Sequence, residues 1–160
     1  MPAAPCSAKK DGGHSPPYES MLFSAKAEYA CVAMMELAAR HGDPKPVRLT
    51  DIADKHGISS RFLVQILLQL KGAGLVNSTR GAAGGYLLAR APETITLFDV
   101  VTVIDSTEPT SQPNYRREAT AYVQNVRAVW ERIVQAQQDV LKGTTLAELV
   151  QQSQGLQYVI

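Results

Sequence analysis

The 160-residue chain has only two cysteines, Cys6 and Cys31, and no long uninterrupted run of apolar residues. Two isolated cysteines argue against a disulfide framework and fit a reducing compartment. Without an apolar run of about 20 residues, the sequence offers no candidate membrane span. Residues 1–20 are rich in proline, glycine and serine and lack the apolar segment of a secretory signal. We therefore expect a cytoplasmic protein in which residues 1–20 are a disordered tail, or lie upstream of a start at Met21.

The sequence also has little that would support catalysis or metal binding. Its three histidines, His14, His41 and His56, stand at unrelated spacings without clustered cysteines or carboxylates, so no metal site is predicted. The glycine-rich stretch RGAAGGY, residues 80–86, lacks the lysine and the serine or threonine of a phosphate-binding P-loop. No nucleophile–base pair and no pair of acids stands out. These absences predict a protein that is not an enzyme, with no catalytic residues and no cofactor.

The formal net charge of +1 conceals an uneven distribution. Residues 21–90 carry nine lysines and arginines against five aspartates and glutamates, whereas residues 91–160 carry five against eight. A basic front half and an acidic rear half fit an anion-binding region joined to a region with another role. Many ordinary domains show a comparable asymmetry, so the charge supports this interpretation without establishing it.

Apolar spacing within residues 21–90 predicts three helices followed by a β-hairpin. The expected N-caps of the three helices are Ser24, Thr50, and Ser59 or Ser60. The glycines expected to end them are Gly42, Gly57 and Gly72. The stretches LVNST and YLLA predict two short strands around RGAAGGY. A tight turn at residues 56–58 makes the order that of a helix-turn-helix followed by a wing.

In a helix-turn-helix, the first residues of the second helix of the motif face the major groove of DNA. The outward-facing side chains expected there are Ser59, Ser60, Arg61 and Gln65. The expected buried stripe of the same helix is Phe62, Leu63, Ile66, Leu67 and Leu70. Because arginine pairs with guanine edges and glutamine with adenine edges, Arg61 and Gln65 are candidate base-reading residues. Alternatively, they are only the polar face of an amphipathic helix.

The glycines of the loop, Gly81, Gly84 and Gly85, allow two compatible interpretations. They supply positive φ for a hairpin connection, or they remove side chains so that the backbone can lie against a phosphate or a groove wall. Arg80 is the single cation at the root of this bare loop. A surface arginine is by default solvated, but the position of Arg80 behind a helix-turn-helix favours insertion into the minor groove.

The second half of the chain predicts a different role. Thr96 and Asp99 have capping-box spacing and open a further helix, and residues 106–115 form a loop marked by prolines. A long helix is predicted from about Arg116 to Leu141, with apolar residues spaced 4, 3, 4, 3 and 4. These seam residues are Tyr122, Val126, Val129, Ile133, Ala136 and Val140.

The seam could pack on its own domain, but little chain remains to cover it. We therefore expect this seam to be the dimerisation surface, packed against a second copy of the chain. Thr145 and Glu148 repeat the capping-box spacing and predict a short last helix.

Three stretches, SAKAEYACVAMMELA, LTDIADKHGISSRFLVQILLQLKGAGLVNSTRGAAGGYLLAR and ITLFDVVTVID, resemble the Rrf-type family of bacterial transcription regulators. The resemblance covers residues 21–149, and its combination of turn, helix end and wing is specific. It implies a mainly α fold with a small β-hairpin wing, divided into a winged helix-turn-helix domain (21–105), a loop (106–115) and a dimerisation helix with a C-terminal helix (116–160). It also implies a homodimeric, sequence-specific repressor or activator whose partner is double-stranded operator DNA.

The resemblance assigns roles to individual residues. It implies that Arg80 enters the minor groove and that the third helix reads the major groove. It also implies that Lys26 contacts a DNA phosphate; the alternative is that Lys26 is simply solvated. Tyr29 is a core or boundary aromatic whose hydroxyl is a second candidate for a phosphate contact. Val64 stands where many members carry a glutamate, so base specificity should differ here, for example through contact with a thymine methyl.

Cluster-binding members of the family carry three cysteines in the loop before the long helix, whereas the stretch STEPTSQPNYRRE has none. That loop and the ending VWERIVQAQQDVLKGTTLAELV resemble the branch that represses cysteine metabolism, so no iron–sulfur cluster is predicted. The signal is then a small molecule, a partner enzyme or thiol oxidation, and sulfur, cysteine or redox genes are the expected targets. Cys31 is interpreted as a small buried apolar residue, with redox sensing as the alternative.

A different class of function remains open at this point. A winged-helix module can bind a partner enzyme without binding specific DNA. The basic front half and the polar start of the third helix argue against that alternative.

Overall fold

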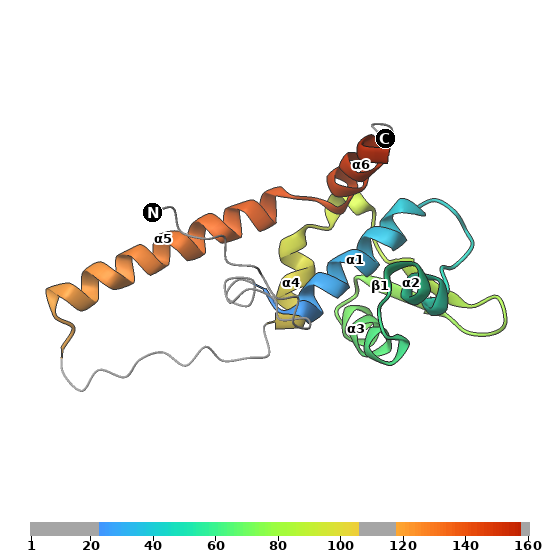
Figure 1. Ribbon diagram of the computed structural model, residues 1–160, viewed down its shortest axis with the longest axis horizontal. Coiled ribbons are helices and arrows are strands. Elements are labelled where there is room, and N and C mark those ends of the chain that lie inside the picture. The colour runs from blue at the N-terminus through green and yellow to red at the C-terminus, as the bar shows by residue number, and fades with distance from the viewer. Residues whose placement is uncertain (1–22, 106–117, 158–160) are drawn as a thin grey trace, which may run out of the picture.

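The computed structural model describes residues 23–105 and 118–157, and it has the expected mainly α fold with a β-hairpin wing (Figure 1). Its elements are α1 (Ala25–Ala39), α2 (Leu49–His56), α3 (Ser60–Gly72), β1 (Val76–Thr79), β2 (Gly85–Leu88), the short 3-10 helix η2 (Pro92–Thr94), α4 (Leu97–Asp105), α5 (Ala121–Gly143) and α6 (Leu146–Gln157). The predicted tail and loop prolines fall outside the described residues. No helix within the described ranges is long and apolar enough to cross a bilayer.

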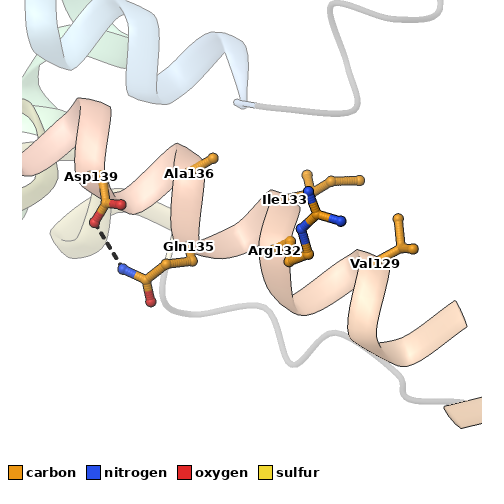
Figure 2. Close-up of a pocket in the computed structure, with 6 residues that line it drawn as sticks. All are labelled: Val129, Arg132, Ile133, Gln135, Ala136 and Asp139. Carbon is orange, nitrogen blue, oxygen red and sulfur yellow. Dashed lines mark hydrogen bonds between the residues drawn. The ribbon is translucent and has the colours of Figure 1, made fainter. Parts of the chain in front are cut away.

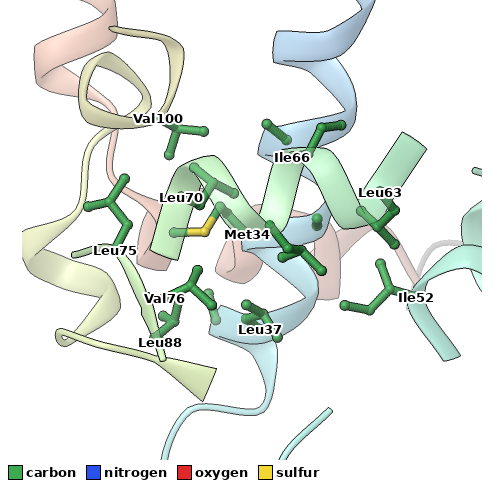
Figure 3. Close-up of a cluster of buried hydrophobic side chains, with 14 of the residues drawn as sticks. Met34, Leu37, Ile52, Leu63, Ile66, Leu70, Leu75, Val76, Leu88 and Val100 are labelled. Atoms are coloured by element: carbon green, nitrogen blue, oxygen red, sulfur yellow. The ribbon is translucent and has the colours of Figure 1, made fainter. Parts of the chain in front are cut away.

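The core forms around α1, which is capped by the Ser24 hydroxyl accepting from the N–H of Ala27. Met34 and Leu37 of α1 meet Ile66 and Leu70 of α3, and the apolar ends of both strands close the cluster (Figure 3). Helices α2, α3 and α4 and the hairpin therefore share a single core with α1. This packing holds the helix-turn-helix and the wing in a fixed arrangement.

Two local expectations were wrong. Helix α2 begins at Leu49 after Arg48, so Thr50 lies inside the helix and provides no cap. Phe62 is 38 % exposed rather than part of the buried stripe of α3, because its ring packs at the surface against Tyr29 of α1. The remaining members of the expected stripe are fully buried.

Both predicted capping boxes are present. The N–H of Thr96 donates to Asp99 (2.9 Å) at the start of α4, and that of Thr145 donates to Glu148 (3.1 Å) at the start of α6. The peptides beside these boxes pair with each other, because the N–H of Leu146 donates to the carbonyl of Ile95 (3.0 Å). Helix α6 thus returns to the winged-helix body and packs against α1 and η2.

Helix α5 extends away from this body as a long arm (Figure 1). It begins at Ala121, capped by Thr120, five residues later than the start predicted at Arg116, which lies outside the described residues. Only its last turn, at Leu141, is buried in this single chain. The arm therefore presents most of its surface to solvent or to another molecule.

Candidate nucleic-acid interface

The turn between α2 and α3 fixes the direction of α3. Gly57 ends α2 with a φ of 65°, a left-handed conformation that glycine adopts without steric cost. The next residue, Ile58, is buried and donates its N–H to the carbonyl of Ala53 (3.0 Å). The turn is therefore held by the core, and α3 leaves it at a set angle to α2.

The start of α3 presents a polar surface. Ser59, Ser60, Arg61 and Gln65 are all exposed, while the apolar residues of α3 face inward. The Ser59 side chain makes no capping hydrogen bond. Within the described part of the chain, Arg61 has no carboxylate partner. The four side chains predicted to meet DNA are thus exposed at the start of α3, with Arg61 and Gln65 on one face of the helix; that they bind DNA remains a prediction.

Leu68 belongs to the same face and was not foreseen. It is 52 % exposed and follows Gln65 by three residues, as Gln65 follows Arg61 by four, so the three side chains line one side of α3. The i, i+4, i+7 spacing from Arg61 was a signal that could have found it. Val64, proposed for a thymine methyl, is only half-buried, so its methyl groups are partly accessible as well.

The start of α1 lies beside the start of α3. Tyr29 and Phe62 pack edge to face, with ring centroids 5.8 Å apart and planes at 89°. Lys26, one turn before Tyr29, is half-buried, and Tyr29 is exposed. The aromatic pair thus brings the predicted phosphate-binding residues of α1 to the end of α3 that carries Arg61.

The wing is an antiparallel hairpin in which Thr79 pairs with Gly85, with a loop from Arg80 to Gly84. Gly81 has a φ of 106°, so it supplies the predicted positive φ. Gly84 and Gly85 do not have positive φ; a Cβ on Gly84 would overlap the carbonyl oxygen of Thr79, and one on Gly85 that of Val47. The protein's own backbone packing and turn geometry therefore require glycines in this loop, independently of any contact that the loop makes with DNA.

Arg48 holds the wing from outside the hairpin, which sequence reasoning did not anticipate. Its Nη2 donates to the carbonyl oxygen of Ala82 in the loop (3.3 Å). The preceding residue, Val47, pairs with Tyr86 through two backbone hydrogen bonds (2.9 and 2.8 Å) and joins the edge of the hairpin as an isolated bridge. Arg80 is exposed, and in the described residues it has no carboxylate partner. The wing is thus braced, with one uncommitted guanidinium at its root.

The predicted seam of α5 is exposed along its length in this single chain. Tyr122 is 85 % exposed and Val140 68 %. Val129, Ile133 and Ala136 line one side of a shallow groove of about 530 Å³, which Arg132 and the hydrogen-bonded pair Gln135 and Asp139 also line (Figure 2). Such a run of exposed apolar side chains is typical of an interface.

The apolar face of α5 is wider than predicted. Trp130 and Val134, which are outside the seam, are also large apolar side chains left exposed. Trp130 lies one turn after the seam residue Val126, and Val134 lies one turn after Trp130, so two successive i+4 steps from Val126 would have found both. A face of this width can contact more than one partner helix.

An iron–sulfur cluster does not fit the residues present. Burial, together with the carboxylates of Asp105 and Glu28, raises the pKa of the Cys31 thiol to about 11, so the thiolate that ligates iron is disfavoured. The described residues contain no group of three histidine, cysteine, aspartate or glutamate side chains able to hold a metal ion. Since the chain has only one further cysteine, Cys6, a set of three or four cysteine ligands cannot form within it.

Comparison with known proteins gives a consistent result. Residues 23–152 match the Rrf2 family, described as iron-dependent transcriptional regulators. The chain is 36 % identical to the HTH-type transcriptional regulator CymR of Bacillus subtilis over 137 residues, which is 86 % of this chain and 95 % of that protein. It is 34 % identical to the HTH-type transcriptional regulator IscR of Erwinia tasmaniensis, over 81 % of this chain and 79 % of that protein.

Solved structures resemble the fold in the same way. The structure of CymR described as the global cysteine regulator of B. subtilis has a TM-score of 0.69 at 36 % identity, covering 81 % of this chain and 95 % of that one. The structure of T. potens IscR has a TM-score of 0.68 at 33 % identity, covering 85 % of this chain and 90 % of that one. The winged-helix arrangement is therefore shared with both regulators.

Proposed function

Since the chain belongs to the Rrf2 family of transcriptional regulators, we propose that it binds operator DNA as a two-fold homodimer, with α3 in the major groove and the wing in the minor groove. It is a DNA-binding transcriptional regulator and not an enzyme, as its family and relatives are. The observation that carries the finer proposal is a pair of exposed arginines, Arg61 on α3 and Arg80 on the wing, on a body that fixes both elements. Neither has a carboxylate partner among the residues that the structure describes.

Each element has a distinct part in the proposal. Arg61 and Gln65 read base edges, and Leu68 contacts a thymine methyl on the same face. Lys26, Tyr29 and the Ser59 and Ser60 hydroxyls hold the phosphate backbone, which sets position without reading sequence. Arg80 enters a narrow A·T-rich minor groove, where negative potential is concentrated.

The α5 seam forms the dimer. Its exposed apolar side chains are buried against the same surface of a second copy, which gives an isologous interface. Two winged-helix bodies then meet two half-sites of one operator, as in other dimeric helix-turn-helix proteins.

The regulated genes follow from the resemblance to CymR. That relative is described as the global cysteine regulator of its organism, and in this chain the stretch STEPTSQPNYRRE ahead of α5 has no cysteine. We assign the protein to the control of sulfur and cysteine genes as a repressor without an iron–sulfur cluster. Its signal is a small molecule or a partner enzyme. Iron and sulfide analysis of anaerobically purified protein tests the absence of the cluster. Colourless, iron-free protein is expected, and stoichiometric iron and sulfide would overturn this part of the proposal.

The wing contact is tested by titrating labelled operators that carry either A·T or G·C pairs beneath the wing, at one fixed salt concentration. Arg80→Ala should weaken binding by about tenfold or more and abolish the preference for A·T flanks. Arg80→Lys should recover only part, because lysine is more strongly hydrated. The matched control is Lys71→Ala, a cation at the exposed far end of α3. If Arg80→Ala binds both operators as the wild type does, the wing is a plain hairpin.

A further inference from the structure

A second concave site lies on the side of α1 that faces α6, within the winged-helix body. Its volume is about 440 Å³, within the range of small-molecule sites. Val32 and Met35 of α1 and Val150 of α6 give it an apolar wall. Glu36 of α1 and the last residues of α2 give it a charged end. None of these residues has a part in the DNA contacts proposed above.

The charged end holds more positive than negative groups. Glu36 is only 6 % exposed and pairs with Arg40 (3.2 Å), Lys55 (2.7 Å) and His56 (3.1 Å). Burial acts to raise the pKa of the Glu36 carboxyl. The hydrogen bonds from Lys55 and His56 and the charges of Lys55 and Arg40 outweigh burial, so its pKa lies below the usual value. The two permanent cations Lys55 and Arg40 thus share one carboxylate, which leaves a local excess of positive charge, and His56 adds to it only when its ring is protonated.

Hydrogen-bonding capacity remains free at this end. An ammonium group has three N–H donors, and Glu36 is the one carboxylate that Lys55 meets in the described residues. His56 uses only its Nε2 for Glu36. The side chain of Gln154 of α6, which also lines the site, makes no hydrogen bond with any other residue that the structure describes. A second carboxylate could therefore be bound by Lys55 and Gln154 without displacing Glu36, and by His56 as well when both of its ring nitrogens carry a proton.

The site also touches the element that positions α3. Lys55 and His56 form the end of α2 and directly precede Gly57, whose left-handed conformation starts the turn into α3. The opposite wall is α6, which follows the α5 arm. An occupant would bridge the helix-turn-helix and the C-terminal region, so its binding energy would act on their relative position.

We propose that this site binds a small carboxylate with a short apolar tail, held by Lys55, His56 and Gln154 with the tail against Val32, Met35 and Val150, and that its occupancy changes operator affinity. The second half rests on the proposed function. The competing explanation is that Glu36 and its cations only fasten α1 to α2. A purely structural cluster would not distinguish a carboxylate from an uncharged molecule of the same shape.

The test uses isovalerate as the probe and isovaleramide as its uncharged counterpart. Amide NMR spectra of isotope-labelled full-length protein are recorded without DNA during titration with each. Isovalerate should give saturable shifts at residues of the site. Isovaleramide should bind at least about tenfold more weakly, because the charge-assisted hydrogen bonds are lost. Absence of saturable shifts, shifts confined to other surfaces, or equal binding of the two probes would overturn the site.

Three variants sharpen the result. Lys55→Met should weaken isovalerate binding by about tenfold, whereas Lys71→Met, an exposed lysine on α3 outside the site, should not. Val150→Phe fills the apolar wall without touching the charged cluster, so it should abolish binding even if Lys55→Met proves unstable. Unchanged binding in a folded Val150→Phe variant would contradict the assignment.

The regulatory half is measured separately, by operator titration with and without isovalerate at constant ionic strength. A change in operator dissociation constant of threefold or more is expected, as an order-of-magnitude figure, and operator DNA should change isovalerate affinity by the same factor. Binding of isovalerate with no change in operator affinity overturns the regulatory half. Failure of the unliganded protein to bind an operator counts against the proposed function and leaves the NMR result on the site standing.

Discussion

The backbone of Gly85 lies directly against the backbone of Val47, so closely that a Cβ at position 85 would overlap the Val47 carbonyl oxygen. Two hydrogen bonds between Val47 and the neighbouring residue Tyr86 hold this contact. The segment before α2 and the second strand of the wing are therefore joined by this bridge. The orientation of the wing is thus tied to the helix-turn-helix and is not that of a free hairpin.

Gly85→Ala should separate these two segments. Overpacking of this kind costs about 1–3 kcal/mol of folding free energy, and the wing should lose its fixed position. Thermal unfolding and operator titration measure the two effects. Ala83→Ser, at an exposed position of the same loop, should change stability by less than about 0.5 kcal/mol. Wild-type stability and operator affinity in Gly85→Ala would show that the contact is not restrictive.

Arg61→Ala and Gln65→Ala should each relax base preference at one position per half-site. The expected loss is about 1–3 kcal/mol at the matching base pair, because the base edge keeps its polar groups while its partner is gone. Selection of bound sequences from random DNA gives the preference of each variant. Leu68→Ala should instead weaken selection for thymine. If both polar variants select the wild-type sequence, these side chains face phosphate or solvent.

Ile133→Glu should dissociate the dimer, because it places a charge in the centre of the α5 seam. Sedimentation at micromolar concentration should show a wild-type dimer and a monomeric variant. Ala128→Glu is the matched control: it lies five residues earlier, about 140° around the helix from Ile133, and should leave the dimer intact. A monomeric wild type at that concentration would refute the proposed assembly.

Cys31 should be a poor thiol for redox sensing. With its pKa raised to about 11, about one thiol in ten thousand is ionised at pH 7, and reactivity should rise only as the pH approaches 11. The alkylation rate of a Cys6→Ser variant between pH 7 and pH 10, folded and in denaturant, measures this. The denatured protein should react far faster at neutral pH. Equal rates would return thiol oxidation to the candidate signals.

The sequence by itself determined the local structure and its order. Glycine at position 57, the capping boxes at Thr96 and Thr145, and the helical spacing of apolar residues depend on neighbours within a few residues, so they can be read from the chain. The candidate residues at the start of α3, Ser59, Ser60, Arg61 and Gln65, were found in the same way, because a polar face at the start of a helix after a tight turn is a local pattern.

Only the tertiary structure decided features that depend on residues far apart in the chain. It placed Phe62 at the surface against Tyr29 and attached Arg48 to the wing. It also showed that glycine is needed at positions 84 and 85 because a Cβ there would overlap the backbone of Thr79 or Val47. It also returned α6 to α1, which created the site around Glu36 between elements more than 100 residues apart. Such contacts arise when whole helices pack on a common core, and no spacing pattern within one segment encodes which partner that packing supplies.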